Sequence, residues 1–175
     1  MFTTSNRYNG DLITEAINNF AACSGVTTGL DAADCICQEH ADSVGLNALY
    51  AAWLADDSGS PDTRFVQSFV QPYVRIDNKL VANDWTDLTD GSIANPLNID
   101  ENGNAIPTST TVVWTHVRTN GTTDGGATDD CINWTGGQSF SFGGVGRHGS
   151  TGGTWTDVNA LANCSVALSL YCFEQ

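Results

Sequence analysis

Six cysteines limit what this 175-residue chain can fold into. They are an even number and contain no C-x-x-C pair. The nearest two, Cys35 and Cys37, have a spacing that suits a zinc site poorly. We therefore expect disulfides, which form outside the cytosol. The six positions are Cys23, Cys35, Cys37, Cys131, Cys164 and Cys172.

The last two cysteines bracket a segment in which apolar residues alternate. Val166, Leu168, Leu170 and Cys172 fall on one side of this alternation. Such a pattern is typical of a β-strand with one buried face. A strand at this position needs to be held in place. Its cysteines could tie it to distant parts of the chain.

Two helices are expected in the first 45 residues. Asp11 can cap the first, in which apolar residues recur at helical spacing over residues 12–21. The second is expected over 30–44, followed by Gly45. Cys37 lies on its apolar stripe, whereas Cys35 lies roughly 200° around the helix. The two cysteines should therefore have different partners.

The remaining pattern indicates short strands between long polar loops. Residues 73–81 read as a hairpin around Asp77-Asn78, and 112–115 as a strand. Residues 49–54 are apolar on every side, so periodicity leaves strand and helix equally open. The chain predicts one α+β domain over 1–175, with a mixed, mostly antiparallel sheet and two helices on one side. The long loops are 86–111, 120–130 and 136–154.

The charge of the chain limits its partners. Twenty acidic and six basic residues give a net charge of −14. Nucleic acids and anionic membrane surfaces are therefore not expected as partners. No apolar run approaches the roughly 18 residues of a membrane helix, so membrane insertion is not expected either. An acidic chain with many cysteines is typical of a secreted or surface-displayed protein.

The order of residues near the C-terminus resembles a known signature. Trp155-x-Asp157, Cys164 and then Cys172-x-Glu174 are similar to the closing residues of C-type lectin-like domains. Further segments are similar to endostatin and to bacterial endostatin-like surface proteins. The resemblance covers about residues 30–175, and residues 1–29, a strand and a helix, look like an addition to it. These further segments are 50–54, 84–91, 113–115 and 131–134.

The resemblance implies both disulfide pairing and a role. The endostatin pattern pairs Cys37 with Cys172 and Cys131 with Cys164, which leaves Cys23 with Cys35. It also implies that residues 49–54 form a strand. Some bacterial relatives bind host proteins, so the resemblance implies an adhesion-type module that recognises an extracellular protein or glycan.

Three properties of related proteins do not transfer. Endostatin binds heparin through clustered arginines, but the five arginines here are scattered. Its zinc-binding histidines have no counterpart, because His40, His116 and His148 are far apart. The Glu-Pro-Asn loop of calcium-dependent sugar-binding lectins is also absent from the sequence.

One cluster of oxygen-bearing side chains is a candidate calcium site. Asp100, Glu101, Asn102 and Asn104 offer the hard oxygen ligands that Ca²⁺ prefers. The alternative is a turn around Asn102-Gly103 stabilised by Asx side chains. We favour the turn, because no distant Glu at EF-hand spacing completes a calcium loop.

The tryptophans offer a candidate ligand-binding face. Trp134 and Trp155 flank the Gly-rich stretch, and Asp157 follows closely. Aromatic side chains beside adaptable loops are common in binding surfaces. Taken singly, each tryptophan is better explained as a core residue.

Catalytic motifs are not found in the sequence. It contains neither Gly-x-Ser-x-Gly nor His-Glu-x-x-His, and three disulfides would leave no free thiol. The acidic pairs Asp56-Asp57 and Asp129-Asp130 are interpreted as solvated charge. An enzyme is therefore not expected, and a metal-dependent hydrolase would require a bound metal.

The sequence thus predicts a non-catalytic binding module that uses its long loops. The alternative is a structural module that associates with itself in a surface layer, sheath or fibre.

Overall fold

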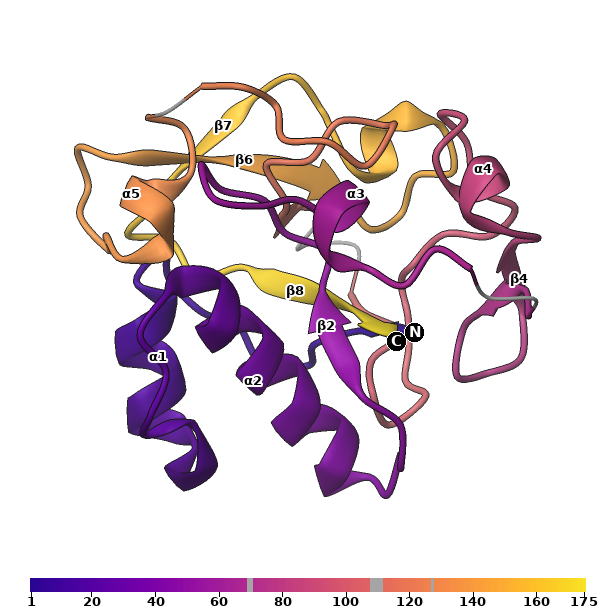
Figure 1. Cartoon of the computed structure of the whole chain (residues 1–175), viewed down its shortest axis with the longest axis horizontal. Coiled ribbons are helices and arrows are strands. Elements are labelled where there is room, and N and C mark those ends of the chain that lie inside the picture. The colour runs from indigo at the N-terminus through magenta and orange to yellow at the C-terminus, as the bar shows by residue number, and fades with distance from the viewer. Residues whose placement is uncertain (69–70, 108–111, 127) are drawn as a thin grey trace.

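The computed structural model describes residues 1–68, 71–107, 112–126 and 128–175. Helices α1 (Leu12–Asn19) and α2 (Gly29–Ser43) lie together beside the main sheet, as Figure 1 shows. The described part of the chain is α+β with a mostly antiparallel sheet, as predicted. None of its helices is long and apolar enough to cross a membrane.

The main sheet has six strands in the order β1-β8-β5-β6-β7, with β2 also paired to β8. Every pairing is antiparallel except that of β5 with β8. A separate hairpin joins β3 (Tyr73–Val74) to β4 (Leu80–Ala82), where the sequence predicted one. The strands of the main sheet are β1 (Phe2–Thr3), β2 (Tyr50–Ala52), β5 (Val112–Trp114), β6 (Phe142–Arg147), β7 (Leu161–Asn163) and β8 (Ser169–Glu174).

Strand β8 pairs with three other strands and is buried on both faces. Cys172 lies opposite Phe2 of β1 and Ala52 of β2. The prediction that only one face would be buried is wrong, because Tyr171 and Phe173 are as buried as Leu170. The prediction also placed Val166 on the buried face, but it precedes the strand and is 41% exposed.

The two faces of β8 contact two separate hydrophobic cores. We call the one beneath α1 and α2 the helix-side core, and the one beneath the loops the loop-side core. The helix-side core includes Leu12, Ala16, Ile36, Cys37, Trp114, Trp134, Leu170 and Cys172. The loop-side core includes Trp53, Phe65, Tyr73, Val81, Leu88, Trp155, Tyr171 and Phe173.

All three disulfides contribute to the helix-side core. They join Cys23 to Cys35, Cys37 to Cys172 and Cys131 to Cys164. These are the pairs that the resemblance to endostatin implies. The link between Cys37 and Cys172 fastens α2 to β8 across 135 residues.

Helix α1 begins at Leu12 as predicted but ends at Asn19, two residues before its predicted end, and α2 lies one residue earlier than predicted at each end. Asp11 accepts a hydrogen bond from the Thr14 N–H (3.1 Å) at the start of α1, and Thr28 accepts one from the Asp31 N–H (3.1 Å) at the start of α2. These side chains satisfy N–H groups that a helix start leaves unpaired. Gly45 follows α2 with a φ of +76°, as a C-terminal glycine does.

The prediction of a loop over residues 136–154 is wrong for the middle of this stretch, which forms β6. This strand reads Phe-Gly-Gly-Val-Gly-Arg, which carries little β-propensity. Its glycines are required by close packing: a Cβ on Gly146 would lie 2.2 Å from the Trp155 carbonyl oxygen. Strand β7 was also not predicted.

The two other predicted loops hold short helical turns. The stretch 86–111 begins within α4 (Trp85–Leu88), and its last four residues lie outside the described part of the chain. The stretch 120–130 ends at Asp130, which caps α5 (Cys131–Trp134). The remaining short elements are α3 (Pro61–Arg64) and the 3₁₀ turns η1 (Ala21–Cys23) and η2 (Gly153–Trp155).

Candidate functional site

A polar pocket lies where the start of α2, the loop after β2 and α5 meet. Its volume is about 340 Å³, and it is lined by three segments that are far apart in the sequence. We call it the α5 pocket. Its lining residues are Thr27, Thr28, Gly29, Asp56, Asp57, Ser58, Asn133 and Thr135.

The α5 wall of the pocket is a left-handed turn. Cys131, Ile132, Asn133 and Trp134 have φ values of +54°, +61°, +54° and +58°. None of them is glycine, and this conformation costs about 1–2 kcal/mol for each such residue. The surrounding structure must therefore hold the turn in place.

Buried contacts on both sides hold this turn. Cys131 is bonded to Cys164, and the Trp134 indole N–H donates to the Ala55 carbonyl (2.8 Å). The first turn of α2 also packs closely against it, since a Cβ on Gly29 would lie 2.2 Å from the Asn133 carbonyl oxygen. The turn thus presents Asn133 and Thr135 to the pocket.

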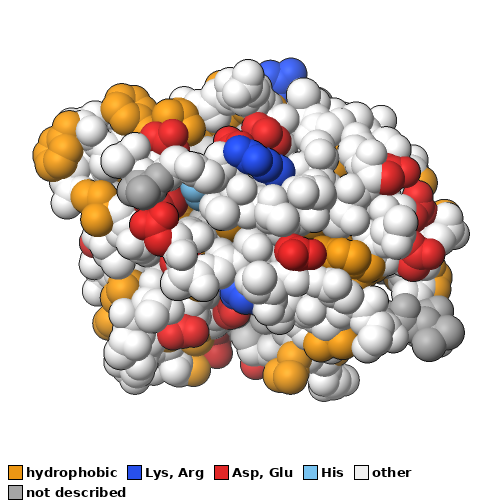
Figure 2. All heavy atoms as spheres, turned by 45° about the horizontal axis from the view of Figure 1, so that its top comes forward, with side chains coloured by type: hydrophobic (Ala, Val, Ile, Leu, Met, Phe, Trp, Pro, Cys, Tyr) orange, Lys and Arg blue, Asp and Glu red, His pale blue; other side chains and the backbone are white. Residues whose placement is uncertain are grey.

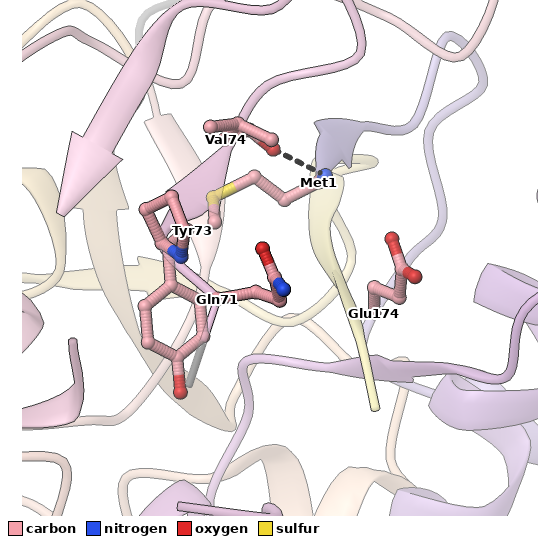
Figure 3. A pocket seen from close by; sticks show the side chains of 6 residues that line it. Met1, Gln71, Tyr73, Val74 and Glu174 are labelled. Atoms are coloured by element: carbon pink, nitrogen blue, oxygen red, sulfur yellow. Dashed lines mark hydrogen bonds between the residues drawn. The ribbon is translucent and has the colours of Figure 1, made fainter. Parts of the chain in front are cut away.

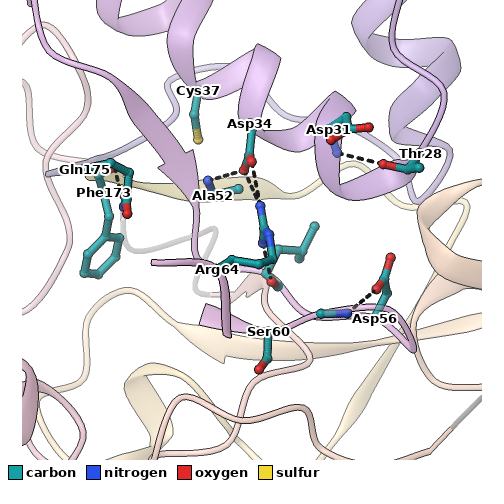
Figure 4. Close-up of polar contacts among 12 residues, drawn as sticks. Thr28, Asp31, Asp34, Cys37, Ala52, Asp56, Ser60, Arg64, Phe173 and Gln175 are labelled. Atoms are coloured by element: carbon teal, nitrogen blue, oxygen red, sulfur yellow. Dashed lines mark hydrogen bonds and ion pairs between the residues drawn. The ribbon is translucent and has the colours of Figure 1, made fainter. Parts of the chain in front are cut away.

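Asp56 supplies a carboxylate to the floor of the pocket. Its side chain is only 3% exposed, although the sequence suggested solvated charge here. Oδ1 accepts hydrogen bonds from the Ser58 N–H (2.7 Å), the Ser58 hydroxyl (2.7 Å) and the Gly59 N–H (3.1 Å). The other oxygen, Oδ2, is turned toward the first turn of α2 (Figure 4). Among the described residues it has no hydrogen-bond donor.

Hydrogen-bond donors face this carboxylate across the pocket. Asn133 Oδ1 accepts from the Asp57 N–H (3.2 Å), which leaves the Asn133 amide nitrogen available. Thr28 Oγ1 accepts from Asp31, so its own proton is also available. The pocket therefore combines the carboxylates of Asp56 and Asp57 with several neutral donors.

An ion pair fixes the loop that carries Asp56. Arg64 contacts both carboxylate oxygens of Asp34 at 2.6 Å and donates to the Leu54 carbonyl (3.0 Å), as Figure 4 shows. Asp34 also accepts from the Ala52 N–H (2.8 Å). Burial raises the pKa of Asp34 even though Arg64 opposes the shift. This pair anchors both ends of the 52–64 segment to α2.

The structure does not place the predicted tryptophans on a binding face. Trp134 and Trp155 are both 0% exposed, so each is a core residue, which is the interpretation that the sequence favoured for each taken singly. Trp155 packs in the loop-side core with ring centroids 5.0 Å from Trp53 and 5.8 Å from Tyr171. Asp157 is partly exposed, and it accepts a hydrogen bond from the Asn159 N–H (2.6 Å).

The four candidate calcium ligands do not converge. Asp100 Oδ1 accepts from the N–H groups of Asn102 (2.9 Å) and Asn104 (2.8 Å), which is the Asx-stabilised turn. Glu101 is engaged elsewhere, since it is 6% exposed and its Oε1 lies 2.9 Å from His40 Nδ1. No group of three or more His, Cys, Asp or Glu residues in the described part of the chain could hold a metal ion.

Glu101 belongs to a buried polar network. It also accepts hydrogen bonds from the N–H and hydroxyl of Ser5, and His40 Nε2 lies 2.6 Å from the Tyr8 hydroxyl. Burial alone would raise the pKa of Glu101, but the contacts with His40 and Ser5 outweigh it and lower the pKa to about 2. The network fastens the 99–105 turn to α2.

A second pocket lies near the chain termini. Met1, Gln71, Tyr73, Val74 and Glu174 surround a volume of about 230 Å³, and the Met1 amine donates to the Val74 carbonyl (2.9 Å), as Figure 3 shows. Gln71 borders residues that the structure does not describe. We therefore regard the α5 pocket as the stronger candidate.

Comparison with protein families and with curated proteins finds no match for this chain. The site must therefore be interpreted from its own chemistry. Sequence reasoning missed Asp56, Asn133 and the two threonines because they are ordinary loop residues. Only the fold brings their three segments together.

Proposed function

We propose that this chain is an extracellular binding module that holds a glycan in the α5 pocket without converting it. The observation that carries the proposal is the Oδ2 atom of Asp56, a carboxylate oxygen without a hydrogen-bond donor among the described residues, which faces the pocket on a residue only 3% exposed. The proposed ligand site lies mostly outside the long loops in which the sequence predicted it, because two of its three segments come from residues 27–29 and 56–58.

The mixture of groups in the pocket favours a neutral hydroxylated ligand. An anion would be repelled by Asp56 and Asp57 on a chain of charge −14. A metal ion is not favoured, because no group of three or more His, Cys, Asp or Glu residues in the described part of the chain could hold one. A sugar hydroxyl can donate to a carboxylate and accept from an amide at the same time. Vicinal hydroxyls therefore match the pair formed by Asp56 and Asn133.

Further observations support the extracellular and lectin-like parts of the proposal. Three disulfides are typical of an oxidising compartment. The links Cys37–Cys172 and Cys131–Cys164 are those that the resemblance to C-type lectin-like and endostatin-like domains implies. We propose this fold family for the chain on those grounds.

The test is a glycan array followed by calorimetry on the best glycan. Asp56→Asn keeps an oxygen for the hydrogen bonds of Oδ1 and replaces Oδ2 by a donor. Loss of one charged hydrogen bond should weaken binding about tenfold. Asp42→Asn removes the same charge at the far end of α2 and should leave affinity unchanged. Equal affinities of the wild type and Asp56→Asn would refute the assignment.

The array should be run with and without calcium. Binding in the α5 pocket requires no metal, so chelator should not change it. Binding of the chain to an extracellular-matrix protein instead of a glycan would place the ligand site outside the α5 pocket.

The runner-up function is a structural module that assembles into a layer, sheath or fibre. The observation that favours it is a group of exposed apolar side chains on and beside β6 and β7, since Phe140, Phe142 and Leu161 are 76%, 43% and 45% exposed. Light scattering distinguishes the two functions, because the particles that an assembling module forms should keep growing as its concentration rises.

A further inference from the structure

The left-handed turn of α5 is held at its two ends and exposed between them. Cys131 and Trp134 are 0% exposed, whereas Ile132 is 52% exposed and Asn133 lines the pocket. Figure 2 shows hydrophobic side chains on the surface at the left end, the end of the molecule that carries α5. The middle of the turn has little packing of its own, so its conformation depends on the two buried ends.

The hydrogen bond within the turn does not determine its handedness. The Trp134 N–H donates to the carbonyl of Asp130, four residues earlier (2.8 Å). A right-handed turn makes the same bond, and it is the favoured hand for residues other than glycine. Contacts outside the turn must therefore select the left hand.

The Cys131–Cys164 bond occupies a narrow slot between two glycines. A Cβ on Gly10 would lie 2.4 Å from Cys131 Sγ, and one on Gly143 would lie 2.8 Å from the same sulfur. The Gly10 N–H donates to the Cys164 carbonyl (2.8 Å), which fixes one wall of the slot. Two separate thiols need more room than a bonded pair, so the slot fits the disulfide and not the reduced cysteines.

We propose that the α5 pocket forms only after Cys131 and Cys164 have been oxidised to the disulfide. In the reduced chain Cys131 leaves the slot, and the turn relaxes to a conformation that its residues favour. Asn133 and Thr135 then no longer line the pocket. The inference rests on the proposed function only in its last step, in which the oxidised chain binds a glycan and the reduced chain does not.

The oxidation requires a disulfide as electron acceptor. Each of the two thiols gives up one proton and one electron as the sulfur–sulfur bond forms, and the acceptor disulfide becomes two thiols. Such acceptors belong to the compartments in which protein disulfides form and persist. The chain therefore acquires its binding activity in an oxidising compartment and is inactive before it arrives there.

Glycine and alanine at one position report the handedness of the turn. At Ile132, whose φ is +61°, Ile132→Gly should melt about 2–4 °C higher than Ile132→Ala. Both variants lose the side chain, but only glycine adopts this φ without strain. At Ile17, in the right-handed helix α1 and 43% exposed, alanine should be the more stable residue. Alanine being more stable at both positions would overturn the proposal.

The same comparison tests whether the disulfide selects the left hand. In a chain that also carries Cys131→Ala and Cys164→Ala, the advantage of glycine over alanine at position 132 should vanish. An advantage that persists would show that the turn stays left-handed without the bond, which contradicts the proposal. The matched control carries Cys23→Ala and Cys35→Ala, which remove the link between η1 and α2, and it should keep the advantage.

A reduction equilibrium tests the same coupling in chains that keep all six cysteines. Because coupling is reciprocal, dithiothreitol should reduce the Cys131–Cys164 bond about fivefold less readily in Ile132→Gly than in Ile132→Ala. Alkylation of the free thiols followed by mass spectrometry measures this ratio. Equal reduction of the two variants would refute the coupling, and this result decides even where the chain without the bond does not fold.

Glycan binding separates this inference from the proposed function. Toward the glycan that binds best on the array, the chain with Cys131→Ala and Cys164→Ala should bind roughly tenfold more weakly, because only the fraction with a formed pocket binds. The chain with Cys23→Ala and Cys35→Ala should bind like the wild type. Wild-type affinity in both would reject the role of the bond and leave the proposed function intact. An array without any bound glycan would reject the proposed function, while melting and reduction still decide on the turn.

Discussion

The two cores on either side of β8 are stabilised in different ways. The helix-side core contains Cys37 and Cys172 and is crossed by all three disulfides. The loop-side core contains no disulfide among the described residues and is built from stacked aromatic rings. One strand supplies alternate residues to both. The covalent links act mainly by restricting the unfolded chain, whereas the rings act by removing apolar surface from water.

This difference makes the helix-side core sensitive to the redox state and the loop-side core sensitive to packing. The α5 pocket lies on the helix side, where Cys131–Cys164 and Gly29 hold its wall. A ligand site that depends on a left-handed turn benefits from a covalent anchor. The four predictions that follow test the contrast.

The largest effect is expected from the long disulfide. Replacing both Cys37 and Cys172 by serine should lower the free energy of unfolding by about 5 kcal/mol, because the link closes a loop across 135 residues. The Cys23–Cys35 link closes a loop across only 12 residues, so replacing both of these cysteines by serine should cost about 3 kcal/mol. Denaturant unfolding measures both. Equal losses would show that loop length does not set their contributions.

A comparable effect is expected in the loop-side core. Trp53 is fully buried, and its ring centroid lies 5.2 Å from that of Phe173 and 5.7 Å from that of Phe65. Trp53→Ala should cost about 3–5 kcal/mol. Reducing agent should not change this cost, whereas it should abolish the difference between the wild type and the long-disulfide variant. Leu49→Ala, at a site 72% exposed, is the control.

The network around Glu101 predicts a dependence of stability on pH. Its folded pKa of about 2 lies below the ordinary value of 4.5. Its contribution is therefore complete above pH 4.5 and is lost as the pH falls toward 2. Glu101→Gln should remove on the order of 2 kcal/mol at neutral pH. The difference from wild type should shrink on acidification.

The control for Glu101→Gln is Glu39→Gln, which removes one negative charge from a residue of α2. Thermal melts of the two variants at neutral and acidic pH provide the measurement. A pH-independent difference between Glu101→Gln and wild type would show that the carboxylate does not act through its charge.

The smallest effect is expected at the ion pair beside the pocket. Arg64→Lys keeps the charge but loses the fork that contacts both oxygens of Asp34. We expect a loss of about 1 kcal/mol in the free energy of unfolding. Arg118 forms an ion pair with Asp124, but its side chain is 55% exposed. Arg118→Lys should therefore have no measurable effect. If both variants unfold alike, the Arg64 pair does not anchor the loop.

Sequence reasoning succeeded where local signals determine the structure. Asp11 begins α1 as predicted, because a side-chain cap is a local interaction. Asp77-Asn78 marks the hairpin for a similar reason. The position of Cys37 on the apolar stripe of α2 also indicated that it would not share a partner with Cys35.

Sequence reasoning failed where distant segments determine the structure. Strand β6 has a glycine-rich sequence because Trp155 and His116 pack directly on its backbone, and no local pattern reports this. Ile132 adopts a left-handed conformation that its β-branched side chain disfavours. The α5 pocket could not be predicted, since its three segments meet through long-range contacts such as the Cys131–Cys164 disulfide, the Trp134 hydrogen bond and the packing of Gly29 on Asn133.

The pairing of β8 with β1, β2 and β5 also has a kinetic consequence. Strands β1 and β2 lack a partner in the main sheet until β8 is available, and such distant contacts form slowly. At 5–20 residues per second, Cys37 waits on the order of 10 s for Cys172. Cys23 and Cys35 emerge close together during that interval and can pair first. Early oxidation of the short link would leave Cys37 as the one thiol among the first three, which protects the long link from mispairing.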